Sequence, residues 1–226
     1  MQLTARLKEE KNMSREAKAL KRENNELEKQ LSKENEDIQT DIVVYIRSAN
    51  ISDIDQERVR RDITQMLIDG EARGESAADV IGGDYKAFCD EIIAEIPKLS
   101  RAKRVLVAIR DVLPALMVLF AIWAVFSVLT QVINGDVWYI TPLSLSDIIT
   151  GAALLIAASL IVVYITKNSF SSKPAPLICL VLLVIAIALC GALLLPDKAV
   201  FSPHIAADAV LLAVLYAAYK IIDSKL

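Results

Sequence analysis

The chain has 226 residues, of which 54% are hydrophobic and 23% charged, and a formal net charge of −3. So small a net charge, with acidic and basic residues interspersed, excludes the concentrated basic surface of a nucleic-acid-binding protein. One histidine and three scattered cysteines cannot supply a metal site. We therefore expect no metal, no cofactor and no direct binding to nucleic acid.

The N-terminal part is predicted to be helical. Residues 1–48 contain no glycine or proline and are rich in Ala, Leu, Glu and Lys, which favours one long helix or two joined helices. We assign residues 1–34 to a charged helix with a short coiled-coil seam. The seam residues recur at spacings of three and four: Ala17, Leu20, Asn24, Leu27 and Leu31.

Two interpretations of this seam remain open. In the first, the helix packs along its own domain. In the second, it forms a parallel dimer in which Asn24, at a core position of the coiled coil, fixes the register. Two heptads are fewer than the three or four that identify a coiled coil. We nevertheless expect the protein to be a homo-oligomer.

Residues 35–97 are predicted to form a small helical domain. Ser52 with Asp55, and Ser76 with Asp79, have the spacing of a helix N-cap and an acidic third residue. Further signals mark where helices should end or begin: Gly70 or Gly74, Gly82, Asp84 and Pro97. A domain this small is expected to be only marginally stable alone.

The same region resembles a known family. It reads LEKQLSKENEDIQTDIVVYIRSANISD and then VRRDITQMLIDGEARGESAADVIGGDYKAFCDEII. This is similar to bacterial helical domains of the HAAS and permease-prefix type, whose G-[ED]-S-x-x-[DE]-V-[IL]-G segment is matched at residues 74–82. The resemblance implies fusion to transmembrane segments and association with PadR-like transcription regulators or transporters. It implies no catalytic residues.

Residues 98–111 form a basic linker, which Ser100 should cap as a helix that runs directly into the apolar part of the chain. Within residues 112–226 we expect four transmembrane helices, at about 112–133, 148–165, 177–195 and 205–222, each near the roughly 20 residues that cross a bilayer. The expected fold is therefore all-α, a coiled-coil-like helix and small helical domain followed by a four-helix transmembrane bundle.

The loops between these segments indicate the topology. Lys and Arg precede the first span, separate the second from the third and follow the fourth, whereas the opposite loops are mainly acidic. Because basic residues stay on the cytoplasmic side, we expect a multi-pass protein of the bacterial cell membrane with both termini cytoplasmic.

Two groups in the apolar part are candidate sites. Small residues that recur every four positions let helices approach closely in lipid, which makes Ala209, Ala213 and Ala217 a candidate packing face. Ionisable residues near the outer ends of the spans form a candidate polar cluster of Asp147, His204 and Asp208. Both carboxylates are expected to reach water.

No phosphate-binding loop, dinucleotide motif or catalytic triad is present, so we expect no enzyme. The expected function is a membrane-anchored adaptor or regulatory protein whose cytoplasmic domain binds a PadR-like regulator or a transporter subunit. The alternative is a small multi-span transporter or efflux component, or a membrane scaffold, that acts as an oligomer.

Overall fold

The computed structural model describes residues 2–170, 178–179, 181–186 and 198–226, with side chains from residue 12 onward. These residues are mostly α-helical, as predicted. The chain divides into two compact units, the first made mainly of residues up to Val107 and the second beginning at Ala108. Each unit is described separately below.

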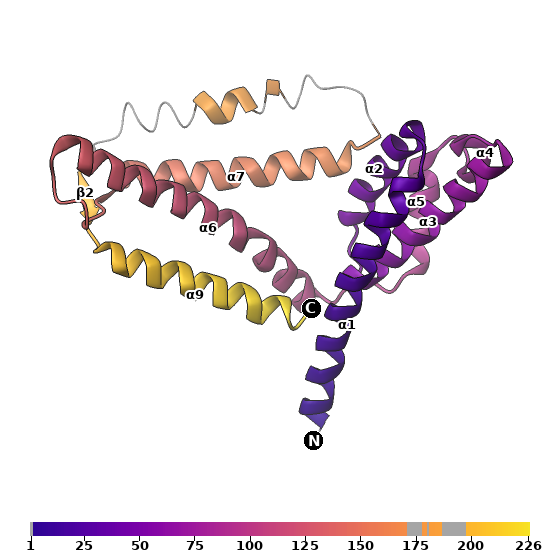
Figure 1. Cartoon of the computed structure of the whole chain (residues 1–226), viewed down its shortest axis with the longest axis horizontal. Helices are drawn as coiled ribbons and strands as arrows, with labels where there is room; N and C mark the ends of the chain where they lie inside the picture. The colour runs from indigo at the N-terminus through magenta and orange to yellow at the C-terminus, as the bar shows by residue number, and fades with distance from the viewer. Residues whose placement is uncertain (1, 171–177, 180, 187–197) are drawn as a thin grey trace. The chain divides into compact units, whose positions relative to one another are not determined.

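The first unit is a helical N-terminal domain (Figure 1). Its elements are α1 (Gln2–Leu27), the 3-10 turn η1 (Glu28–Gln30), α2 (Lys33–Arg47), α3 (Asp53–Arg73), α4 (Ala77–Ile81) and α5 (Tyr85–Glu95). The N-terminal segment is thus two joined helices and not one. The break comes at residues 28–32, where Leu31 is extended and the Ser32 side chain accepts a hydrogen bond from the Asn35 amide.

The predicted helix caps are confirmed. Ser52 caps α3, and Ser76 forms a reciprocal capping box with Asp79 at the start of α4. Gly74 ends α3 with a φ of 75°, a conformation that glycine adopts without strain. Gly70 lies inside α3, where a Cβ would stand 2.3 Å from Val80 Cγ2, so this glycine allows α3 and α4 to approach closely.

An apolar core joins α2, α3, α4 and α5. Its buried side chains are Leu31, Ile42, Ile46, Ile51, Val59, Ile63, Leu67, Ala77, Ile81 and Cys89. Burying an aliphatic side chain of this size contributes about 1.5–3 kcal/mol. The core therefore supplies the main stabilisation of the domain. Burial in this core also raises the pKa of the Cys89 thiol to about 12.

A short connector joins the domain to the apolar helices. The Leu99 amide donates to the Asn50 carbonyl at 2.9 Å, which fixes the connector to the turn between α2 and α3. Ser100 then caps α6 (Arg101–Asn134), accepting from the Lys103 amide at 3.3 Å. The predicted continuous helix through the basic linker is confirmed, and Pro114 lies inside it.

The second unit contains most of the apolar helices. Helices α6, α7 (Leu145–Lys167) and α9 (Ile205–Asp223) are each long and apolar enough to cross a membrane. They contain the predicted spans at 112–133, 148–165 and 205–222. Most of the fourth predicted span, at 177–195, lies outside the described residues, and residues 178–179 and 181–186 of it are helical. The structure therefore supports three candidate spans.

A small β-sheet in this unit was not predicted. Strand β1 (Leu143–Ser144) pairs antiparallel with β2 (Ala199–Phe201). The C-terminal end of α6 and the N-terminal ends of α7 and α9 meet at this pair (Figure 1). Apart from these strands, the regular structure of the described residues is helical. The strands are too short to show an alternating sequence pattern.

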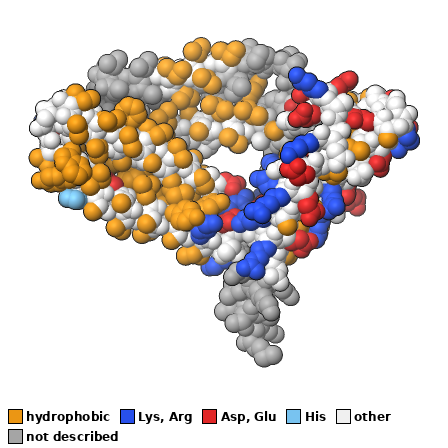
Figure 2. Space-filling view, in the orientation of Figure 1, with side chains coloured by type: hydrophobic (Ala, Val, Ile, Leu, Met, Phe, Trp, Pro, Cys, Tyr) orange, Lys and Arg blue, Asp and Glu red, His pale blue; other side chains and the backbone are white. Residues whose placement is uncertain are grey.

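Apolar side chains cover the surface of these helices. Figure 2 shows them over α6, α7 and α9, whereas Lys, Arg, Asp and Glu gather over the N-terminal domain. Exposed examples are Phe126 at 64% and Ile133 at 81%. Few side chains of α6, α7 and α9 are buried. Water-soluble monomers rarely expose so much apolar surface, which is typical of contact with lipid or protein.

Candidate functional site

The described residues contain a buried polar network between α1, η1, α2 and α3. We use this name for five side chains, Asn24, Glu28, Arg47, Glu57 and Arg60, of which Asn24, Glu57 and Arg60 are buried. Charged side chains are seldom buried unless they are paired and hydrogen-bonded. The tertiary fold therefore has to bring these five side chains together, so that each buried charge has a partner.

Glu57 lies at the centre of the network. Its carboxylate accepts from Asn24 Nδ2 at 2.9 Å, from Arg47 Nη2 at 2.6 Å and from Arg60 Nη1 at 3.2 Å. Burial alone would raise the pKa of Glu57, but these hydrogen bonds and the charges of Arg47 and Arg60 lower it below its ordinary value. Glu57 is thus held as a buried carboxylate.

Arg60 links this carboxylate to α1 and η1. Its guanidinium pairs with both carboxylate oxygens of Glu28, Nε donating to Oε1 at 2.7 Å, and Nη2 also donates to Asn25 Oδ1 at 2.9 Å. Such bidentate pairing is the strongest geometry of an arginine–carboxylate pair. On the far side, Gln39 Nε2 donates to Thr64 Oγ1 at 2.7 Å, so α2 and α3 are also joined by polar contacts.

One polar atom of the network has no partner. Asn24 is fully buried, and its amide group donates to the Glu57 carbonyl as well as to the carboxylate, while Asn24 Oδ1 accepts nothing within the described structure. The amide cannot be reversed, because its oxygen would then face two acceptors. An unpaired buried acceptor costs about 1–3 kcal/mol. This cost reduces the free energy with which α1 packs against α3.

The predicted seam faces the chain's own domain. Ala17 and Leu20 are buried in a small cluster with Ile54 of α3, and Leu31 belongs to the main core. Asn24 bonds to Glu57, and Leu27 is half-buried. In this structure the seam faces α3 of its own chain, as in the first interpretation. The dimer interpretation stays a prediction.

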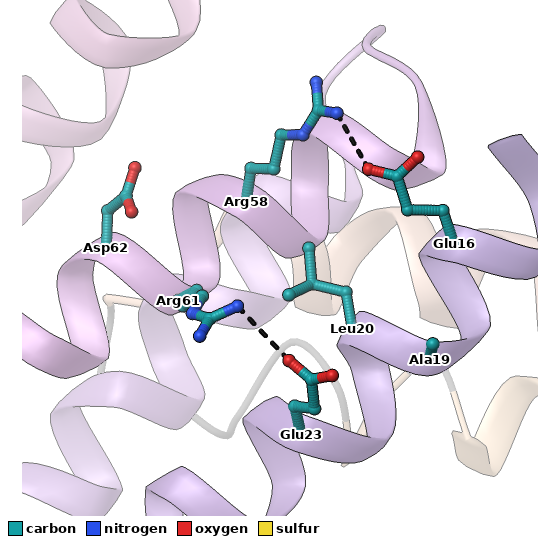
Figure 3. Close-up of a pocket in the computed structure, with 7 residues that line it drawn as sticks. All are labelled: Glu16, Ala19, Leu20, Glu23, Arg58, Arg61 and Asp62. Carbon is teal, nitrogen blue, oxygen red and sulfur yellow. Dashed lines mark hydrogen bonds and ion pairs between the residues drawn. The ribbon is translucent and has the colours of Figure 1, made fainter.

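A shallow groove runs between α1 and α3 beside this seam (Figure 3). It measures about 430 Å³ and is lined by Glu16, Ala19, Leu20, Glu23, Arg58, Arg61 and Asp62. Two ion pairs bridge it, Arg58 to Glu16 at 3.0 Å and Arg61 to Glu23 at 3.2 Å. All four side chains are more than half exposed, and such pairs contribute at most about 1 kcal/mol each. The groove is therefore a solvent-exposed contact between two helices.

Replacing Asn24 by leucine tests this arrangement. The substitution removes two hydrogen bonds to Glu57 and should weaken the docking of α1 by about 1–3 kcal/mol. We expect faster amide hydrogen exchange in α1 of the full chain in detergent, with no change in oligomeric mass. Arg22→Leu, at an exposed position of the same helix, is the matched control. A changed mass in Asn24→Leu alone would favour the dimer interpretation.

The predicted alanine face is exposed. Ala209, Ala213 and Ala217 all lie on the open side of α9, while Asp208 is the buried residue of this helix. The same face of α9 as Asp208 also carries the half-buried residues Ile205, Leu212 and Leu215. Among the described residues, therefore, α9 is covered along a different face from the one that the alanines form.

The predicted outer polar cluster is built around the loop after α6. Asp208 Oδ2 accepts from Thr141 Oγ1 at 2.6 Å and is 4% exposed, so the expectation that this carboxylate reaches water is wrong. The His204 ring lies 5.4 Å from the Tyr139 ring. Asp147 accepts from the Ser144 amide and hydroxyl and thereby caps α7. The three residues make separate contacts, and within the described structure no hydrogen bond or ion pair joins them to one another.

One pattern in the sequence of α3 is a signal of the buried polar network. Glu57, Arg60 and Thr64 recur at spacings of three and four beside the apolar stripe of α3, which places them on one buried edge of the helix. Their partners in α1 and η1 lie more than 25 residues earlier and could not be assigned. In the described part of the chain, no group of three or more metal-binding side chains is found.

No family model matches the chain, and comparison with curated proteins and with solved structures finds no similar protein. The likeness to HAAS-type domains therefore rests on the residues quoted above.

Proposed function

We propose that this chain is a non-enzymatic membrane protein whose N-terminal helical domain is an adaptor for a cytosolic protein partner. One observation carries the proposal: a domain with its own core is joined, through the single continuous helix α6, to helices whose apolar side chains are exposed. Such an arrangement holds a folded domain at a membrane surface and leaves its outer faces free for protein contact.

The membrane location is supported by three described helices of sufficient length and apolarity. A fourth span at 177–195 and cytoplasmic termini complete the proposal. The distribution of Lys and Arg supports this topology. With an even number of spans, the N-terminal domain and the C-terminus lie on the same side.

The adaptor role is favoured over transport by where the charges lie. In α6 every acidic or basic residue precedes Val112, and in α7 and α9 they lie near the helix ends. These spans therefore offer no charged group in mid-membrane for an ion or proton path. The resemblance to HAAS-type domains points to a PadR-like regulator or a transporter subunit as the partner. We further propose that the protein acts as a homo-oligomer.

Photo-crosslinking in intact bacterial cells tests partner and topology together. A photoreactive amino acid replaces one exposed alanine of the N-terminal domain at a time: Ala72, Ala78, Ala87 or Ala94. We expect neighbouring positions to crosslink to one and the same cytosolic protein, because a docked partner covers a continuous surface. The same amino acid at Ser202, exposed beside β2, is the control and should crosslink to no cytosolic protein.

The opposite result would be clear. If none of the four domain positions captures a cytosolic protein, the adaptor proposal fails. Solute flux in proteoliposomes of the purified chain would then favour the transporter alternative. Cytosolic crosslinks from Ser202 would reverse the proposed topology.

A further inference from the structure

The start of α6 is strongly basic. Residues 96–110 contain five basic and no acidic side chains. Three of the basic residues, Arg101, Lys103 and Arg104, lie in the first two turns of the helix. We call these three side chains the basic collar.

The collar has no partner within the described chain. Arg101, Lys103 and Arg104 form no side-chain ion pair or hydrogen bond with any residue that the structure describes. By contrast, every arginine of α2 and α3 pairs with a carboxylate: Arg47, Arg58, Arg60, Arg61 and Arg73. The collar charges are therefore available to an external anion.

The length of α6 places the collar beside the membrane surface. At 1.5 Å per residue its 34 residues span about 51 Å, whereas the hydrocarbon layer is about 30 Å thick. The apolar stretch from Val112 onward is sufficient to cross that layer. Residues 101–111 then extend about 16 Å beyond it, through the layer of lipid headgroups.

The exposed side chains around the collar fit that layer. Val105 and Ile109 are 58% and 44% exposed and follow the collar on the same helix. Basic heads with apolar side chains beneath them are typical of helices at a membrane interface, where the basic groups reach phosphates and the apolar groups reach acyl chains.

We propose that the basic collar is a binding site for the headgroups of anionic phospholipids. Its guanidinium and ammonium groups donate to lipid phosphate oxygens and fix the start of α6 at the membrane surface. The Leu99–Asn50 hydrogen bond places this anchor directly beside the N-terminal domain. The inference rests on the membrane location in the proposed function but not on the adaptor role.

Quenching by brominated lipids tests the collar directly. Val105→Trp in a chain with Trp123→Phe and Trp138→Phe puts one tryptophan beside the collar, and the full chain is reconstituted in vesicles. We expect dibromo-phosphatidylglycerol to be preferred to dibromo-phosphatidylcholine around this tryptophan by about fivefold or more. A factor of about five corresponds to the interaction of one basic residue with anionic lipid. Because surface charges are screened by salt, the preference should fall in 0.5 M NaCl, a concentration at which the screening length is about 4 Å.

The variant Arg101→Gln, Lys103→Gln, Arg104→Gln should lose the preference. The control Arg15→Gln, Lys21→Gln, Arg22→Gln removes the same charge from the exposed face of α1 and should keep it. Equal loss in both variants would mean that net charge, and not the collar, attracts the lipid, and would overturn the proposal.

Two further outcomes separate the explanations. Sodium phosphate and NaCl at equal ionic strength should reduce the preference equally; a larger effect of phosphate would indicate a site for soluble phosphate and contradict the proposal. Equal quenching by both lipids would also overturn the collar while leaving the membrane location intact. If neither lipid quenches the tryptophan, the membrane location itself fails, and the proposed function with it.

Discussion

Replacement of Arg60 by alanine should destabilise the N-terminal domain by about 3–5 kcal/mol. The substitution leaves the Glu57 carboxylate buried with less compensating charge and removes both guanidinium contacts of Glu28. Breaking one side of a buried ion pair is costly, because the remaining charge has lost its hydration without keeping its partner. Amide hydrogen exchange in α3 of the full chain in detergent reports the loss as a lower free energy of opening.

Arg61→Ala is the matched control for Arg60→Ala. Arg61 is the next residue of the same helix, and its side chain is 53% exposed and pairs with the exposed Glu23. The control should change the free energy of opening by less than about 1 kcal/mol. Adding Glu57→Gln to Arg60→Ala should recover part of the loss, since it removes the uncompensated charge. Similar effects of Arg60→Ala and Arg61→Ala would contradict the buried network.

The pH dependence gives a second readout of this network. The pKa of Glu57 in the folded protein lies below its ordinary value of 4.5. Its contribution to stability is therefore fully present above pH 4.5 and is lost as the pH falls through the lower folded value. In Arg60→Ala the pKa of Glu57 should move upward, so that this acid-induced loss begins at a higher pH.

Replacement of Leu67 by alanine should destabilise the same domain by about 2–5 kcal/mol. Leu67 is completely buried in the core that joins α3 to α2, α4 and α5. The loss combines the transfer of the removed methyl and methylene groups to water with the cavity that they leave. The free energy of opening of the α3 amides in the full chain is again the measurement.

Met66→Ala is the control for Leu67→Ala. Met66 precedes Leu67 in α3, has a side chain of similar volume and is 39% exposed. Its truncation should cost less than about 1 kcal/mol, because little cavity forms at a surface. An equal effect of the two substitutions would show that α3 does not bury the face described here.

The sequence predicted the helices of the domain well because their boundary signals are local. Ser52, Ser76 and Asp84 each accept from a backbone amide three residues ahead, and such caps are set by short-range geometry. The continuous helix α6 followed for the same reason, since Ser100 caps it and no helix breaker other than Pro114 interrupts it. The break at residues 28–32 is harder to predict, because no glycine or proline marks it and Ser32 alone caps α2.

The alanine face shows where periodicity is insufficient. Ala209, Ala213 and Ala217 lie on one side of α9, as their spacing requires, yet the covered side is the one that carries Asp208. Spacing establishes which residues share a face. It does not establish which face meets a neighbour, because that depends on where the loops bring the other helices.

By itself, the sequence determined that this protein has a charged helical half and an apolar half, where most helices begin and end, and which residues share a helix face. These properties follow from hydropathy, from caps and from helical geometry, all of which act over a few residues. Only the tertiary structure decided that Asn24 bonds to Glu57, that Arg60 joins α3 to η1, and that Thr141 contacts the buried Asp208. Those contacts join residues 32–67 positions apart, and their partners are selected by the packing of whole helices, which no local pattern encodes.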